Sequence, residues 1–233
     1  MHVPFEWSPE DLEQTLLTLV EANHALNATL RVAIVRNHGG LFEAPNLLRN
    51  ADLVAFTTDL TNWGPGVKLG YIPHARHGAS PFAGTKYTSW AENLTWNEMA
   101  HERGFDEFIL LNEHSQVSEC TSANIFAIAG DRVWTPPLET SGCLPGVTRA
   151  ILLEEIQVAG LTIAECEITP SELEGCDGVF ITSTTRDLVP VLEIEGAPLN
   201  NAGDRLAELQ RAFRRYRESY MAEAKSGKQI FAA

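Results

Sequence analysis

The sequence has 233 residues, of which 44% are hydrophobic and 21% are charged, so it can bury a sizeable core in one large domain or two small ones. This composition excludes a disordered chain, and no apolar run approaches the roughly 18 residues of a membrane span. The formal net charge of −14 repels nucleic acid and anionic membranes, and no signal-peptide pattern is present.

The cysteines do not follow a pattern typical of metal or redox chemistry. No two of them have the CxxC spacing, so we expect neither a metal site nor a dithiol centre. We expect reduced thiols in a cytoplasmic protein. The four residues are Cys120, Cys143, Cys166 and Cys176.

The first part of the chain predicts one helix and two strands. Ser8 is a favourable N-cap and Pro9 fits the first helical position, which predicts a helix over residues 8–23. Apolar residues at helical spacing continue along this segment. Strands are expected over residues 31–36 and 53–56.

A cluster of helix- and strand-breaking residues, Asn62 to Gly66, marks a domain boundary. It predicts a small α/β domain at residues 1–63 and a larger domain at 64–233. The larger part is rich in strands with few, widely spaced helices, which favours an α+β fold with a curved or barrel-like sheet. We expect helices over 89–103, 147–159 and 202–224, an ordered loop over 74–85, and strands over 67–72, 108–111, 117–119, 124–129, 133–135, 162–168, 178–182 and 189–194.

Two charged residues are candidates for chemistry. Lys86 lies at a loop-to-helix junction, where a lone lysine is usually a solvated surface residue. A buried lysine amine, by contrast, loses its proton easily and attacks carbonyl carbons. Glu119 lies in an apolar, strand-like context, so its carboxylate is either exposed on the outer face or paired. The functional interpretation is a carboxylate that faces a cationic heterocycle.

Two segments are candidate anion sites. Leu144 to Arg149, with the sequence LPGVTR, opens a predicted helix whose free backbone N–H groups attract negative charge. The four consecutive hydroxyl residues from Thr182 to Thr185 follow a predicted strand directly. Each pattern also has a structural interpretation, because most such helix starts bind nothing and hydroxyl residues cap turns.

In this order, these motifs resemble the class IV (fold-type IV) pyridoxal-phosphate enzymes, which include branched-chain aminotransferases, D-amino-acid aminotransferases and aminodeoxychorismate lyases. The resemblance runs from about Phe5 to Gly196. It implies a two-domain α+β enzyme whose cofactor is pyridoxal 5′-phosphate. The motifs are Lys86, Glu119 with Asn124-Ile125-Phe126, Thr135-Pro136-Pro137-Leu138, Leu144 to Arg149, and Phe180 to Thr185 followed by Pro190-Val191.

The resemblance also implies residue roles. Lys86 would hold the cofactor covalently and move a proton at the substrate α-carbon, and Glu119 would keep the pyridine nitrogen protonated. The phosphate would be bound by Val147, Thr148, Ser183 and Thr184. Thr185 would lie near the substrate carboxylate. Asn124 and Arg149 would support these residues from behind, and Arg76 is either a further support or a surface residue.

The same resemblance implies a homodimer in which a partner loop closes each site, with an amino acid and a 2-oxo acid as substrates. Members of this family usually begin with a strand that carries a Gly-Asp-Gly-x-Phe-Glu-Thr-like motif and a helix that carries an Arg-Leu pair. Nothing in residues 1–30 of this sequence resembles either motif. We therefore expect about 40 to 50 residues of an ordinary small domain to be missing, through a misplaced start or a true truncation. The resemblance implies that the arginine of the Arg-Leu pair binds the cofactor phosphate, so its loss predicts weaker cofactor retention.

Substrate choice stays open between a general amino-acid transaminase, placed first, and an aminodeoxychorismate-type lyase. Ser89 to Asn93 is similar to some lyase-type members. Arg36-Asn37-His38 has the spacing of the carboxylate clamp of D-amino-acid enzymes but lies too close to a strand end. A truncated, non-catalytic family member is the third hypothesis.

Overall fold

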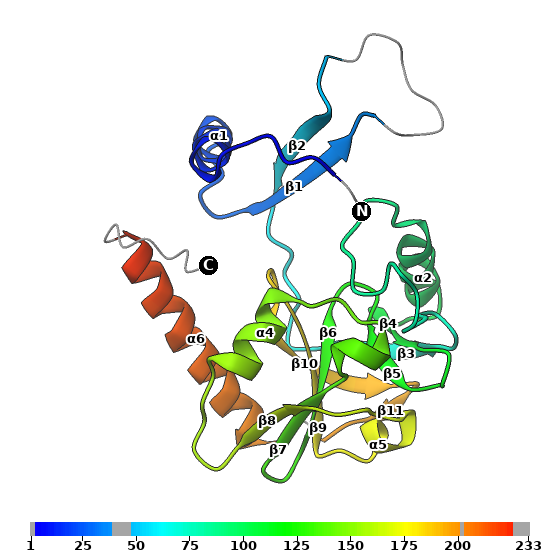
Figure 1. The fold of residues 1–233 in the computed structure, drawn as a ribbon. Helices are drawn as coiled ribbons and strands as arrows, with labels where there is room; N and C mark the ends of the chain where they lie inside the picture. Colours follow the sequence, from blue (N-terminus) through cyan, green and yellow to red (C-terminus); the bar gives the residue numbers. More distant parts are fainter. Residues whose placement is uncertain (1–2, 39–47, 201–202, 226–233) are drawn as a thin grey trace. The chain divides into compact units, whose positions relative to one another are not determined.

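The computed structural model describes residues 3–38, 48–200 and 203–225 (Figure 1). The chain divides into two compact units, Met1–Asn62 and Trp63–Ala233. The functional roles expected for the two parts of the chain stay predictions.

The first unit contains one helix and a two-stranded antiparallel sheet. Helix α1 (Pro9–Ala22) begins where predicted, because the Ser8 hydroxyl accepts a hydrogen bond from the Asp11 amide. Strands β1 (Thr29–Arg36) and β2 (Ala51–Thr58) pair along their full length. Both strands are longer than predicted, because pairing continues beyond the apolar segments into flanking residues such as Thr29, Asp52 and Thr57.

The second unit is built on one nine-stranded mixed sheet, in the order β5-β4-β3-β10-β9-β6-β7-β8 with β11 paired to β10. The predicted α+β class with a curved or barrel-like sheet is confirmed, and the sheet is a curled half-barrel. The β3–β4, β3–β10 and β7–β8 pairs are parallel, and the other pairs are antiparallel. The strands are β3 (Val67–Ile72), β4 (Glu107–Leu111), β5 (Val117–Cys120), β6 (Asn124–Ala129), β7 (Arg132–Thr135), β8 (Thr162–Glu165), β9 (Gly178–Ser183), β10 (Asp187–Ile194) and β11 (Ala197–Pro198).

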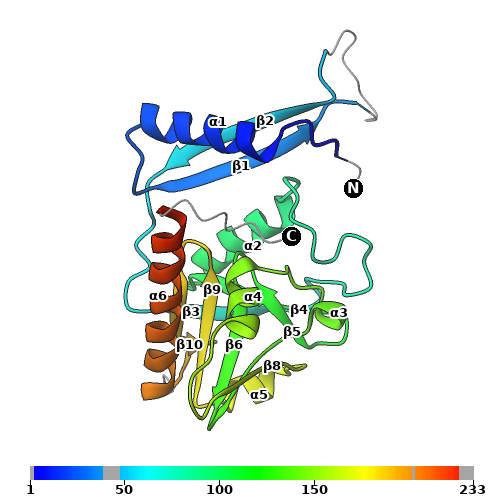
Figure 2. The ribbon, with the colours of Figure 1, turned by 60° about the vertical axis from the view of Figure 1, so that its left-hand side comes forward.

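Five helices accompany this sheet within the described residues, with α6 packed against β10 and α4 against β9 (Figure 2). They are α2 (Ala91–Glu102), α3 (Leu138–Ser141), α4 (Val147–Glu154), α5 (Pro170–Glu174) and α6 (Asp204–Lys225). No helix in the described part of the chain has the length and apolarity to span a bilayer.

Some predicted boundaries are wrong. The helix predicted over 147–159 ends at Glu154, and Ile156 turns into the core beside Leu152. The strand predicted over 162–168 ends at Glu165. Helices α3 and α5 and strand β11 were not predicted.

The core lies on both faces of the sheet because side chains alternate along each strand. Ile125 and Ile181 belong to one buried cluster, which β3, β4 and β10 also line. Phe126 and Phe180 point to the opposite face, where their rings stack at 4.9 Å and pack with α4 and α6. Asn124 shares this second face, so its side chain lies toward α4.

Candidate active site

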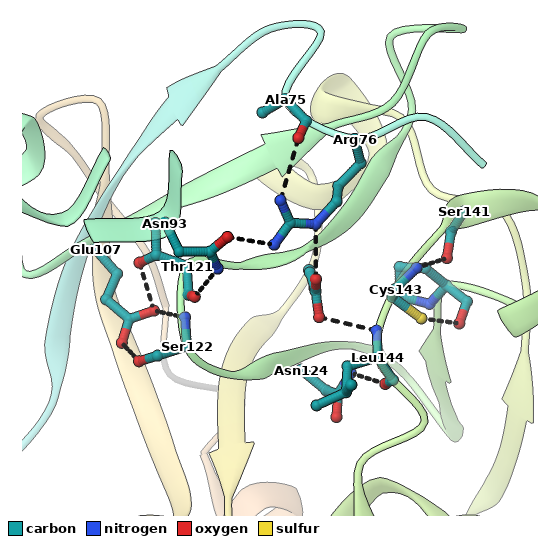
Figure 3. A network of polar contacts seen from close by, with 12 residues as sticks. Ala75, Arg76, Asn93, Glu107, Thr121, Ser122, Asn124, Ser141, Cys143 and Leu144 are labelled. Carbon is teal, nitrogen blue, oxygen red and sulfur yellow. Dashed lines mark hydrogen bonds and ion pairs between the residues drawn. The ribbon is translucent and has the colours of Figure 1, made fainter. Parts of the chain in front are cut away.

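Strand β5 carries the central carboxylate of the candidate site. Glu119, on β5, is only 7% exposed. Its Oε1 accepts a hydrogen bond from Arg76 Nε at 2.8 Å, and its Oε2 accepts one from the Leu144 amide at 3.0 Å. In Figure 3 the dashed lines of these two contacts run from the labelled Arg76 and Leu144 to one unlabelled carboxylate between them. Glu119 is therefore buried and paired, rather than exposed on an outer face.

Arg76 is held by a second layer of contacts. Its NH2 donates to Asn93 Oδ1 at 3.2 Å, and its guanidinium lies 5.4 Å from the centre of the Trp96 ring. Asn93, from α2, in turn donates to the Thr121 carbonyl at 2.5 Å. The Arg76 side chain is 17% exposed. The alternative of a solvated surface arginine therefore does not describe this residue.

Burial raises the pKa of Glu119 above its ordinary value. The Arg76 guanidinium, the Leu144 amide and the Lys86 ammonium oppose this rise, but they do not cancel it. Each carboxylate oxygen keeps a lone pair beyond the one used in the contact described. A further cationic N–H donor would stabilise a buried carboxylate of this kind.

Lys86 lies in the segment between β3 and α2, and its side chain is exposed. Burial, which the chemical interpretation of this lysine assumed, is not seen. The contribution of its charge to the pKa of Glu119 shows that the two groups are within electrostatic reach of each other.

The segment that carries Lys86 is tied to the rest of the unit at several points. The Leu111 carbonyl accepts from the Ala75 amide at 2.8 Å, and Glu113 Oε2 accepts from the Gly78 amide at 2.9 Å. A Cβ on Gly78 would lie 2.3 Å from the Thr140 carbonyl oxygen. The lysine segment therefore packs directly against α3.

The start of α4 presents backbone donors without a side-chain cap. Gly146 is the N-cap, and no side chain accepts a hydrogen bond from the first turn. Val147 is exposed and Thr148 is buried. Asn124 Nδ2 donates to the Leu144 carbonyl at 2.8 Å, and a Cβ on Gly146 would lie 2.1 Å from Asn124 Oδ1. Asn124 thus braces the loop that opens the helix.

Arg149 fixes α4 to the sheet. Its side chain is 3% exposed, pairs with Glu165 at the end of β8, and donates to the Pro136 carbonyl at 2.8 Å. These two contacts tie the first turn of α4 to β8 and to the segment that precedes α3.

The hydroxyl segment comprises the end of β9, at Thr182 and Ser183, and the first residues of the turn to β10. The Arg186 amide donates to the Ser183 carbonyl at 3.1 Å and closes the turn, in which Thr184 and Thr185 are exposed. Thr182 pairs directly with Asn124, so their side chains share the face toward α4. The buried Thr182 Oγ1 has no hydrogen-bond partner among the described residues.

The residues therefore fit a phosphorylated, cationic heterocycle on chemical grounds. Glu119 supplies a buried carboxylate, α4 supplies uncapped backbone N–H groups, and Thr182 supplies an orphaned hydroxyl near that helix start. Within the described ranges, no three His, Cys, Asp or Glu side chains are grouped to hold a metal ion.

Sequence reasoning missed several supporting residues. For Asn93, which links Arg76 to the Thr121 carbonyl, its position in a predicted helix was the only sequence feature that could have indicated the contact. No sequence feature indicates the Leu144 contact, because every residue except proline has a backbone N–H donor. Glu107 and Arg186, a buried pair next to the site, were also missed.

The fold is that of the fold-type IV pyridoxal-phosphate enzymes. The solved structure named "Putative 4-amino-4-deoxychorismate lyase" from Legionella pneumophila superposes with a TM-score of 0.81 at 24% identity, covering 91% of this chain and 79% of that one. A family model described as amino-transferase class IV matches residues 1–194. The chain belongs to the class IV aminotransferase family, whose members use pyridoxal phosphate.

Two curated relatives match shorter regions. The "Putative branched-chain-amino-acid aminotransferase" of Methanocaldococcus jannaschii is 33% identical over 123 residues, which cover 52% of this chain and 42% of that protein. The D-alanine aminotransferase of Bacillus licheniformis is 35% identical over 113 residues, which cover 47% of this chain and 39% of that protein. The aligned region thus spans about two fifths of each relative's length.

Proposed function

We propose that the protein is a pyridoxal-phosphate-dependent aminotransferase that moves an amino group between an amino acid and a 2-oxo acid. The buried carboxylate of Glu119, with its raised pKa and its two protein donors, carries this proposal. When bound, pyridoxal phosphate supplies an electron sink for the negative charge that remains when the α-proton of the substrate is removed.

The residues of the chain have distinct roles in this proposal. Lys86 holds the cofactor covalently and moves the proton at the substrate α-carbon. Glu119 pairs with the pyridine N–H and keeps the proton on that nitrogen. Arg76 orients the Glu119 carboxylate, because its Nε–H donates to one oxygen only and leaves the other for Leu144.

The anionic parts of cofactor and substrate are assigned to two backbone elements. The first-turn amides of α4 at Val147 and Thr148, with Ser183 and Thr184, bind the phosphate. Thr185 lies near the substrate carboxylate. Asn124 and Arg149 keep the α4 start in place through the contacts described above.

We further propose a cytoplasmic homodimer. All four cysteines are free, which fits a reducing compartment. Sedimentation of the purified chain measures the oligomeric state, and a monomer at micromolar concentration would contradict the dimer.

The deciding experiment is the visible absorbance spectrum of the chain with pyridoxal phosphate. We expect a band that is lost on borohydride reduction and is absent from Lys86→Ala. Lys68→Ala is the matched control, because Lys68 is a surface lysine paired with Glu193 in the same unit. A band that persists in Lys86→Ala would overturn the assignment of the lysine.

Assays of the protein with bound pyridoxal phosphate then distinguish a transaminase, a lyase and a non-catalytic family member. Conversion of the band by L-branched-chain amino acids or D-alanine, with release of the 2-oxo acid, identifies a transaminase and its donor. Formation of p-aminobenzoate from aminodeoxychorismate identifies a lyase. A protein that loads the cofactor and converts neither class is the non-catalytic family member.

A further inference from the structure

A second buried ion pair lies beside the turn assigned to anion binding. Arg186 follows Thr185 directly, and its side chain is 4% exposed. Its NH2 pairs with Glu107 at the start of β4 and donates to Ser122 Oγ at 2.9 Å. Its NH1 donates to the Ser122 carbonyl at 3.2 Å. The guanidinium therefore joins the β9–β10 turn to the β5–β6 turn.

The NH1 and NH2 groups of this arginine are bound by partners within the protein. Glu107 is 1% exposed and also accepts hydrogen bonds from Thr121 Oγ1 at 2.9 Å, from the Ser122 amide at 2.9 Å and from Ser122 Oγ at 2.6 Å. The other face of the guanidinium lies 3.7 Å from the centre of the Trp63 ring. NH1 and NH2 are thus engaged within the protein, while the buried Nε has no hydrogen-bond partner among the described residues. Through NH1 and NH2 the contribution of Arg186 is geometric.

The turn is anchored from its other side as well. Asp187, the next residue, has a φ of +55° and pairs with Arg217 of α6. Aspartate is among the residues that tolerate the left-handed region, and the pair with Arg217 ties this position to α6. Ser183 to Arg186 are therefore held between α6 and the β5–β6 turn.

We propose that Arg186 is a positioning residue, which fixes the Ser183–Thr185 turn relative to the turn that follows Glu119. This inference rests on the proposed function, in which the Ser183–Thr185 turn binds the phosphate ester and the substrate carboxylate. Glu119 pairs with the pyridine ring of the same cofactor. The two ends of one bound molecule need their partners at a fixed separation, and Arg186 is the side chain that spans those partners. The Glu107 carboxylate keeps the guanidinium in place.

The test compares a single variant with a charge-neutral double variant. Arg186→Met removes the bridge and leaves Glu107 buried without its cation, so it lowers both stability and cofactor affinity. Glu107→Gln/Arg186→Met removes both charges, so the urea midpoint returns toward that of the wild type. Arg205→Met is the control, because it breaks surface pairs with Asp131, beyond the opposite end of β6, and with Glu208.

For the double variant we expect the dissociation constant for pyridoxal phosphate and the KM for the amino donor to stay about tenfold or more above wild type. Hydrogen exchange at the amides of 184–187 should be faster than in wild type, and unchanged in Arg205→Met. If stability and affinity recover together in the double variant, Arg186 is only structural and the inference is wrong.

The two proposals fail in different ways. A wild-type chain without a Lys86-dependent band contradicts the proposed function. The positioning role is then decided by hydrogen exchange alone, and unchanged protection of the 184–187 amides in the double variant overturns it. If Arg186→Met does not fold, the double variant alone provides the comparison.

Discussion

The pairs Glu119–Arg76 and Glu107–Arg186 place the same two residue types within one strand-rich unit, on the neighbouring strands β5 and β4. Glu107 accepts from Thr121, Ser122 and Arg186, and its surroundings are closed. Glu119 has one donor on each oxygen and an exposed lysine within electrostatic reach. An ion pair is therefore no sign of function by itself. Unused acceptor capacity on a buried carboxylate distinguishes Glu119 from the closed Glu107 pair.

Removal of the Glu107 carboxylate tests the closed pair and should have the largest effect. Glu107→Ala leaves the Arg186 charge buried without a partner, which costs about 3–5 kcal/mol of stability. Urea unfolding measures the loss. Asp131→Ala breaks the exposed pair with Arg205 and should cost about 1 kcal/mol or less. Equal losses in the two variants would show that the Glu107 cluster is not closed.

Removal of the Glu119 charge tests the open pair and should affect rate more than stability. In Glu119→Gln the amide oxygen still accepts from Arg76, while the NH2 group faces the Leu144 amide, so about 1 kcal/mol of stability is lost. We expect the turnover rate to fall on the order of 10²–10³-fold, because the negative charge that holds the ring proton is gone. Steady-state kinetics of the loaded enzyme measures it, and a rate within threefold of wild type would contradict the role.

The packing of the lysine segment allows a third prediction. Gly78→Ala places a Cβ 2.3 Å from the Thr140 carbonyl oxygen, so one of the two backbones must move, at a cost of about 1–3 kcal/mol. The Lys86-dependent band should then form more weakly at equal cofactor concentration. Gly175→Ala, whose Cβ would lie 3.3 Å from the Ser171 carbonyl, is the control. Identical cofactor titrations in the two variants would contradict the prediction, because cofactor binding at Lys86 would then not depend on the packing of its segment.

The pH dependence of stability gives the smallest effect. The pKa of Glu119 is raised in the folded state, so its favourable contribution is present below the ordinary value of 4.5 and is lost as the pH rises through the raised value. Glu119→Gln lacks this contribution, so the stability of wild type relative to the variant should decline from acid toward neutral pH. Urea unfolding at several pH values measures the difference, and a difference that grows in favour of wild type would show the opposite sign.

Comparison of expected and observed elements shows which signals are local. Helix α1 was predicted from Ser8 and Pro9, because an N-cap acts within one turn. Helix α5 had an equally local signal that was overlooked: Thr169 and Glu172 form a capping box around Pro170. Helix α4 was predicted five residues too long, because apolar spacing continues past Glu154 after the helix has ended.

The sequence by itself determined the family, the α+β class and the residue types of the candidate site. Ordered motifs such as Leu144 to Arg149 are local, since backbone donors at a helix start need only adjacent residues. Only the tertiary structure decided that Arg76 meets Glu119, that Asn93 supports Arg76, and that Arg186 spans to Ser122. These contacts join residues between 17 and 64 positions apart. They depend on strand order and register, which bring distant side chains together and which no local pattern specifies.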